Sequence, residues 1–126
     1  MNIQSLDHLV LTVTDIEASI KFYCGILGMK HVQFGDKRHA LKFGEQKINL
    51  HQANNIIQPA AQLPTIGSAD LCFIVNTPIK DIIVELDNAD IKVIEGPVKR
   101  TGATGDILSI YIRDLDMNLI ELSNCI

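Results

Sequence analysis

A histidine near the start of the chain lies in a segment whose pattern predicts a β-strand. In HLVLTV, residues 8–13, the side chains of Leu9, Leu11 and Val13 fall on one face, as in a strand packed against a core. The imidazole of His8 therefore falls on the opposite face. That face either meets solvent or lines a cavity in which several polar side chains converge, and the strand pattern alone leaves both interpretations open.

Polar side chains near the end of the chain follow the same alternation. Glu121 lies between two apolar residues of NLIELSN, so its carboxylate points away from the apolar face. In DILSIYIR, Tyr111 and Arg113 alternate with isoleucines and share one face. If that face lines a cleft, Tyr111 and Arg113 would orient a polar substrate. A single glutamate at such a position is also typical of a solvated strand.

The segment KRTGATGD, residues 99–106, combines two cations with flexible glycines. Backbone N–H groups at Gly102 and Gly105 can approach an anion closely, and Lys99 or Arg100 would supply positive charge. The same residues also fit a solvated hairpin loop. The segment therefore predicts either a substrate contact through Arg100 or an ordinary turn.

The composition is typical of one folded domain of 126 residues, with 47% hydrophobic and 21% charged side chains. A formal net charge of −4 argues against a nucleic-acid-binding surface, which needs a basic footprint. No apolar run is long enough to cross a membrane, and the first residues do not resemble a secretory signal. Three widely spaced cysteines without a CxxC pair argue against a disulfide framework. We therefore expect a cytoplasmic protein with reduced thiols.

The chain repeats one order of predicted elements. After the strand at 8–13, Asp15 is placed to cap an amphipathic helix that ends near Gly28, and three short strands follow. In the second half, Thr77 is the expected N-cap and Pro78 the first residue of a second amphipathic helix. The strand candidates of this half are residues 69–75, 91–97, 106–113 and 118–124.

This repeat predicts an α+β fold, a single domain 1–126 made of two βαβββ modules. The modules span about 5–53 and 68–124, and residues 54–67, which are rich in Pro and Asn, link them. If a helix covers the apolar face of each sheet, the two remaining faces would enclose a shared, cup-shaped cleft. A small open cup leaves strand edges and apolar surface exposed, so we expect a homodimer.

Superposing the two halves pairs residues that could share one site. His8 and Asp70 open equivalent strands, and Asn49 and Glu121 lie at equivalent positions of the last strand in each module. The second half is longer between these positions, and the extra residues fall naturally in VKRTGATGD. The repeat therefore predicts that polar side chains of both modules face one centre.

The segment LDHLVLTVTDIEASIKFYCGILGM, residues 6–29, and the segment YIRDLDMNLIELS, residues 111–123, carry a further signal. They resemble the opening and closing motifs of the glyoxalase/bleomycin-resistance/extradiol-dioxygenase superfamily, also called the vicinal oxygen chelate superfamily. When the segments INLH, residues 48–51, and GPVKRTGATG, residues 96–105, are considered too, the chain most resembles the small glyoxalase-domain-containing subgroup. The resemblance spans nearly the whole chain. It implies paired βαβββ modules and a divalent metal held by ligands from four strands.

Carried over by position, the resemblance implies His8, Asp70 and Glu121 as metal ligands, with Glu121 also the catalytic base. Asn49 stands where glyoxalase I enzymes carry Glu, which argues against lactoylglutathione lyase activity. His51, two residues farther along the same face, is the expected fourth ligand. Imidazole and carboxylate ligands together suit Mn²⁺, Fe²⁺, Zn²⁺ or Ni²⁺.

Each implied ligand also has a purely structural interpretation. Asp70 could cap a turn, and the strand could end before His51. The turn DLDMN lacks the Pro and Gly that the family carries at Leu115 and Met117.

We expect a metal-dependent enzyme, of the lyase, isomerase or dioxygenase type, acting on a small oxygenated substrate. A non-catalytic small-molecule-binding module of the bleomycin-resistance type is the alternative, and a paralogue without a site is a third possibility. Metal-competent residues at the family positions favour the enzyme, whereas Asn49 keeps the binding module open.

Overall fold

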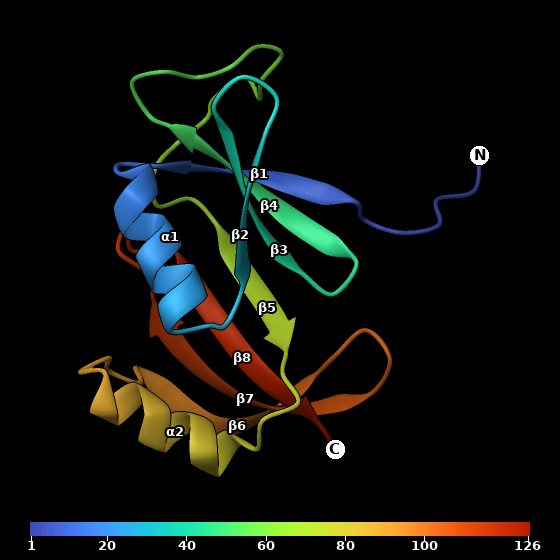
Figure 1. The fold of residues 1–126 in the computed structure, drawn as a ribbon. Helices are drawn as coiled ribbons and strands as arrows, with labels where there is room; N and C mark the ends of the chain where they lie inside the picture. Colours follow the sequence, from blue (N-terminus) through green and yellow to red (C-terminus); the bar gives the residue numbers. More distant parts are fainter. The chain divides into compact units, whose positions relative to one another are not determined.

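In the computed structural model, all residues from 1 to 126 are described, and they form two compact units, Met1–Gly67 and Ser68–Ile126. Each unit has the element order β-α-β-β-β (Figure 1), which confirms the predicted fold class. The elements of the first unit are β1 (His8–Val13), α1 (Ile16–Gly25), β2 (Lys30–Phe34), β3 (Arg38–Phe43) and β4 (Gln46–Gln52). Those of the second are β5 (Asp70–Ile74), α2 (Ile79–Asn88), β6 (Glu95–Thr101), β7 (Asp106–Arg113) and β8 (Leu119–Cys125).

The two sheets have the same topology, with strand orders β1-β4-β3-β2 and β5-β8-β7-β6. In each, the first strand pairs in parallel with the last, and the remaining pairs are antiparallel. The registers also agree, because Val10 lies beside Asn49 in one sheet and Cys72 beside Glu121 in the other. The sequence repeat is therefore a structural repeat, residue by residue, at these positions.

One helix covers one face of each sheet, and equivalent amide side chains fix its N-terminus. Ile16 N donates to Gln52 Oε1 at 3.2 Å, and Ile79 N donates to Asn124 Oδ1 at 2.8 Å. On the same side of each sheet lies its apolar core, whose members include Leu11, Val13, Leu41, Ile48 and Leu50 in the first unit and Ile110, Ile112, Ile120 and Leu122 in the second. We call the other side of each sheet, which carries no helix, its open face.

The helix starts differ in how their first N–H groups are satisfied. Asp15 caps α1 as predicted, and its Oδ1 accepts from Ala18 N at 3.1 Å. Thr77 does not cap α2, because Pro78 occupies the N-cap position and no side-chain cap is made there. The first N–H of α2, at Ile79, is bound by Asn124 on β8, as the first N–H of α1 is bound by Gln52, and the N–H of Asp81 is bound by the backbone oxygen of Pro78.

The strand β6 begins four residues later than predicted, at Glu95 rather than at 91. The register between β6 and β7 shifts between Glu95 and Val98, and this irregularity accommodates Pro97, which has no N–H to donate. Gly96 is required there, because a Cβ atom would lie 2.4 Å from Ser109 O. Consequently Lys99 and Arg100, which were expected in a loop, are strand residues that point to opposite faces.

The turn that leads into β8 is stabilised by Asp114. Its Oδ1 accepts from Asp116 N and Asn118 N, both at 2.9 Å, and its Oδ2 accepts from Asn118 Nδ2 at 2.8 Å. Asn118 is fully buried and accepts from Ala69 N at the start of β5. Met117 adopts a left-handed φ of 68°, in the place where the family carries Gly. The turn therefore forms without the family's Gly, at a cost in backbone strain.

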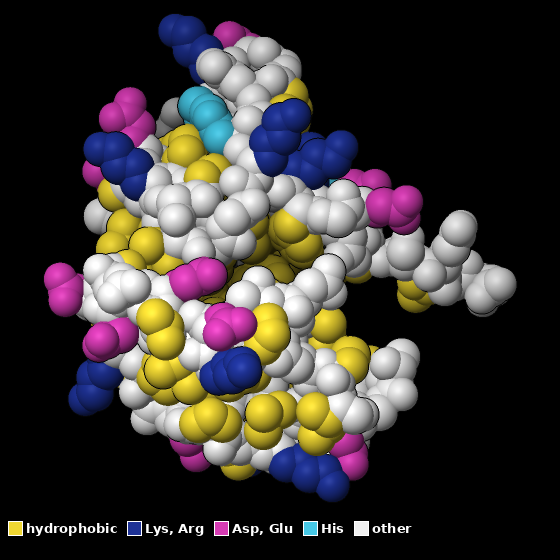
Figure 2. Space-filling view, turned by 60° about the horizontal axis from the view of Figure 1, so that its bottom comes forward, with side chains coloured by type: hydrophobic (Ala, Val, Ile, Leu, Met, Phe, Trp, Pro, Cys, Tyr) yellow, Lys and Arg dark blue, Asp and Glu magenta, His cyan; other side chains and the backbone are white.

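Neither helix of the structure has the length and apolar character needed to cross a membrane. The three cysteines form no disulfide bond. Over the surface shown in Figure 2, acidic and basic side chains are interspersed with hydrophobic ones.

Candidate functional site

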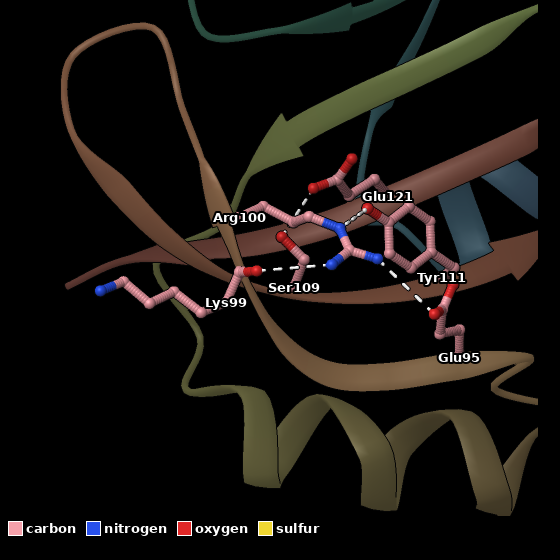
Figure 3. A network of polar contacts seen from close by, with 6 residues as sticks. All are labelled: Glu95, Lys99, Arg100, Ser109, Tyr111 and Glu121. Carbon is pink, nitrogen blue, oxygen red and sulfur yellow. Dashed lines mark hydrogen bonds and ion pairs between the residues drawn. The ribbon is translucent and has the colours of Figure 1, made fainter.

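The open face of the second unit carries two rows of side chains that run across its four strands. The register places Glu95, Tyr111, Glu121 and Cys72 in one row, and Val98, Ser109, Ser123 and Ile74 in the next. The two rows bring together two carboxylates, a phenol, a thiol and two serine hydroxyls. Two of the predicted site residues, Tyr111 and Glu121, belong to these rows, and a third, Arg100, donates a hydrogen bond to Tyr111 (Figure 3).

Two buried serine hydroxyls hold the carboxylate of Glu121. Ser109 Oγ donates to Glu121 Oε2 at 2.6 Å, and Ser123 Oγ lies 3.4 Å from the same oxygen. The hydroxyls of Ser109 and Ser123 are themselves 2.7 Å apart, and both residues are fully buried. All these contacts are made to Oε2, so the carboxylate is oriented and its Oε1 does not take part in them.

Cys72 lies beside this carboxylate but is not activated as a nucleophile. Its Sγ lies 3.4 Å from Ser123 Oγ. Partial burial raises the pKa of the Cys72 thiol, and the neighbouring carboxylates of Glu121 and Asp70 raise it further, against the opposing effect of the Ser123 bond. A thiol needs a lowered pKa and a cationic neighbour to react as a thiolate at neutral pH.

Arg100 reaches along the open face to the phenol of Tyr111. Its Nε donates to Tyr111 Oη at 2.9 Å, and its Nη2 lies 3.6 Å from Glu95 Oε1. Lys99, the neighbouring cation, pairs instead with Asp106 at 3.0 Å. Of the two cations considered for this segment, Arg100 is therefore the one placed near Glu121.

Arg113 and Asp70 lie on the open face one row beyond Glu121. Both pair in register with Leu119, Arg113 from β7 and Asp70 from β5. Arg113 Nη1 donates to Met117 O at 3.3 Å, and both side chains are exposed. The structure thus places them near Glu121 in the sheet but outside its hydrogen-bond network.

The open face of the first unit contains two buried polar side chains with unpaired atoms. His51 and Asn49, two residues apart on β4, are each 4% exposed. Both ring nitrogens of His51 and Oδ1 of Asn49 are buried without a hydrogen-bond partner. Burial lowers the pKa of His51, and the charge of Arg38 lowers it further, so the ring is neutral at pH 7. A neutral imidazole and an amide oxygen with free lone pairs can accept a cation or a substrate donor.

His8 lies on the same face but in a different environment. It is exposed, and its Nδ1 lies 2.8 Å from Asp7 Oδ1. Thr12 is the register partner of His51, so His8 and His51 are four strand residues apart, about 13 Å at the usual rise per residue. Asn49, the register partner of Val10, lies between them.

Nowhere in the chain do three side chains of His, Cys, Asp or Glu come together in a metal-binding group. The four predicted ligands are divided equally, with His8 and His51 in the first unit and Asp70 and Glu121 in the second. A metal bound by all four would therefore need ligands from both units.

The sequence did not predict several contacts of these networks. Alternation within the strands places Ser109 on the face of Tyr111 and Ser123 on the face of Glu121, but it does not predict that both hydroxyls lie close to the same carboxylate oxygen. Glu95 lies inside the predicted strand 91–97, but the register shift between Glu95 and Val98, which sets the row in which Glu95 lies, has no signal in the sequence. Arg38 was missed because nothing in the local pattern relates it to His51.

Residues 5–122 match the profile of the Glyoxalase/Bleomycin resistance protein/Dioxygenase superfamily. The virulence protein STM3117 of Salmonella typhimurium is 58% identical over 123 residues, which are 98% of this chain and 85% of that protein. Its crystal structure superposes with a TM-score of 0.98, covering 100% of both chains at 57% identity. The shared fold therefore extends over the whole chain.

Two further relatives have names that describe a domain or an activity. The glyoxalase domain-containing protein RDO1 of Mycosarcoma maydis is 55% identical over 124 residues, 98% of this chain and 70% of that protein. The metallothiol transferase FosB of Staphylococcus epidermidis is 27% identical over 120 residues, 95% of this chain and 83% of that protein.

Proposed function

The chain belongs to the glyoxalase/bleomycin resistance protein/dioxygenase superfamily, and we propose that it is a metal-dependent enzyme acting on a small oxygenated substrate. Members of this superfamily typically bind divalent metals, and the relative FosB is named a metallothiol transferase. The reaction is of the lyase, isomerase or dioxygenase type.

The observation that carries this proposal is the buried, unpaired imidazole of His51 beside the unpaired amide oxygen of Asn49. A buried polar atom without a partner costs about 1–3 kcal/mol, so such atoms are rare in folded proteins. Clusters of them are typical of sites that are completed by a ligand. The lone pairs present here are those that Mn²⁺, Fe²⁺, Zn²⁺ or Ni²⁺ accept.

We propose His51, Asp70 and Glu121 as the residues that would hold the cation, with the amide oxygen of Asn49 as an alternative to His51. His8, the fourth ligand expected from the sequence, lies about 13 Å from His51 along the strands, too far for both rings to reach one ion. When bound, the cation supplies Lewis-acid polarisation of a substrate oxygen. His51 suits this role because its ring is neutral, which is the form of imidazole that binds metals.

Glu121 is proposed as the base. The donor bond from Ser109 to Oε2 fixes the plane of the carboxylate. Oε1, which takes no part in the serine contacts, is then the oxygen that accepts a proton from the substrate. The buried hydroxyls of Ser109 and Ser123 keep this geometry without adding a second acid to the site.

We also propose that the protein is a homodimer, because each four-stranded sheet ends in two edge strands that a second copy of the chain can cover. Sedimentation equilibrium should give twice the mass of the chain, and a monomer at high concentration would contradict the dimer.

Thermal unfolding of metal-stripped protein, with and without each of the four cations, tests the metal site. A cation at a hundred times its Kd stabilises the folded state by about 2.7 kcal/mol. We expect this stabilisation in the wild type and in His39→Gln, whose ring bonds to His31 at 2.8 Å away from the open face. We expect its loss in Glu121→Gln and in His51→Gln. If no cation stabilises the wild type, the bleomycin-resistance-like binding module replaces the enzyme.

A further inference from the structure

The guanidinium of Arg100 is held in a defined orientation on the open face of the second unit. Nε donates to Tyr111 Oη at 2.9 Å and Nη1 to Lys99 O at 3.4 Å. The side chain is nevertheless 39% exposed, and in Figure 3 its guanidinium lies beside the ring of Tyr111. A cation that is already oriented loses little further freedom when an anion binds to it.

A carboxylate of the protein already lies against this guanidinium, but it is held loosely. Arg100 Nη2 and Glu95 Oε1 are 3.6 Å apart, which exceeds the roughly 2.7–2.9 Å of a charge-assisted hydrogen bond. The side chain of Glu95 is 61% exposed, and exposed ion pairs of this kind contribute little to stability. Glu95 can therefore swing into solvent when another carboxylate arrives.

We propose that the substrate carries a carboxylate and that Arg100 binds it in place of Glu95. The planar fork of a guanidinium matches the two oxygens of a carboxylate and can form two parallel hydrogen bonds with it. Tyr111, which supports the guanidinium, is the register partner of Glu121. A substrate bound to Arg100 would thus extend along this row toward Glu121. This inference rests on the proposed function, because Glu121 is taken as the base that acts on that substrate.

The neighbouring cation provides a matched control. Lys99 is adjacent in sequence and carries the same charge, but it points to the other face of the sheet and pairs with Asp106 at 3.0 Å. A purely electrostatic attraction between the segment and an anion would depend on both cations. A site built around the guanidinium depends on Arg100 alone.

Replacing Glu95 tests the inference through an increase, rather than a decrease, in carboxylate affinity. In the resting protein it competes for Arg100, and its negative charge also repels an incoming carboxylate. Replacing it with Gln should therefore strengthen carboxylate binding, whereas most substitutions near a site weaken binding. A bound divalent cation near Glu121 should strengthen binding as well, because it offsets the second carboxylate on this face.

The experiment is a titration of ¹⁵N-labelled protein with malonate, followed by the arginine Nε–Hε NMR signals, first in EDTA and then with Zn²⁺. We expect a shift of one arginine signal that is absent from Arg100→Lys, with affinity at least tenfold lower in Arg100→Lys and Arg100→Gln. Affinity should rise severalfold in Glu95→Gln and stay unchanged in Lys99→Gln. Inorganic phosphate should bind more weakly than malonate, because it does not match the planar fork as well.

Equal malonate affinity in the wild type and both Arg100 variants would overturn the inference, as would an equal loss in Lys99→Gln. Tighter binding of phosphate than of malonate would overturn the assignment of a carboxylate. The result is separable from the proposed enzyme. If metal stabilises the protein but malonate binding does not depend on Arg100, only this inference fails. If malonate needs Arg100 but no metal binds, the carboxylate site stands and the metal-dependent enzyme is wrong.

Discussion

Replacing His51 with Leu should stabilise the metal-free protein, although the substitution lies at the proposed metal site. Both ring nitrogens of His51 are buried without a partner, and the residue is 4% exposed. Each unpaired buried group costs about 1–3 kcal/mol, and leucine carries none. The different shape of the leucine side chain offsets part of this stabilisation, because a poor fit in a packed interior costs about 1–3 kcal/mol. We therefore expect a net increase of roughly 1–3 kcal/mol in the free energy of unfolding.

The measurement is urea and thermal unfolding at pH 8 in EDTA, comparing wild type, His51→Leu and the control His39→Leu. For a chain of 126 residues, 1 kcal/mol corresponds to about 3–5 °C in Tm. His51→Leu should therefore unfold several degrees above the wild type. His39→Leu should not gain stability, because its Nδ1 is already paired with His31 Nε2 at 2.8 Å.

Adding a stabilising cation should reverse the order, because the wild type gains binding free energy and His51→Leu does not. A loss of more than about 1 kcal/mol in His51→Leu in EDTA would refute the reasoning, since it would mean that the imidazole makes favourable interactions in the metal-free protein.

Three further predictions concern the same networks and the elements that position them. Removing the hydroxyl in Ser109→Ala should lower the turnover number at least tenfold with little change in KM, and Ser109→Thr should restore part of the turnover. Equal turnover in the wild type and both variants would show that the bond from Ser109 to Glu121 does not position the base. Met117→Gly should raise the free energy of unfolding by about 1 kcal/mol in urea titrations, because glycine adopts the left-handed φ of 68° without a Cβ clash; a loss of stability would place the strain elsewhere. Finally, burial lowers the pKa of His51, so the unfolded chain binds a proton first as the pH falls below about 6.5. Stability should therefore fall between pH 8 and pH 5.5 more steeply in the wild type than in His51→Leu, and identical slopes would contradict the burial of a neutral ring.

Much of the fold could be read from the sequence because its signals are local. Strand alternation and helical periodicity predict each element from its own residues, and the repetition of βαβββ predicts two equivalent modules. The side of the sheet on which Tyr111 and Glu121 lie follows from alternation within one strand. The pairing of equivalent positions, such as Asn49 with Glu121, follows from the repeat and agrees with the observed registers.

The sequence failed where a residue's role depends on a distant partner. Thr77 was expected to cap α2, but Asn124 from the last strand satisfies Ile79 N. The start of β6 was placed too early, because the irregularity at Pro97 needs β7 as its partner and has no signal of its own in sequence. Because this irregularity interrupts the alternation between Glu95 and Val98, only the structure could assign Arg100 and Lys99 to their respective faces.

The chemistry of the two networks was likewise a tertiary outcome. The sequence by itself determined that a glutamate, a tyrosine and two serines share one face of a sheet, because alternation is a property of the strand. Three features follow only from the tertiary structure. Both serines contact the same oxygen of Glu121, and Arg100 donates a hydrogen bond to Tyr111. The ring nitrogens of His51 are buried without hydrogen-bond partners. Hydrogen bonding and burial depend on distances between strands, and these are fixed by packing and register rather than by the residues' own positions in the chain.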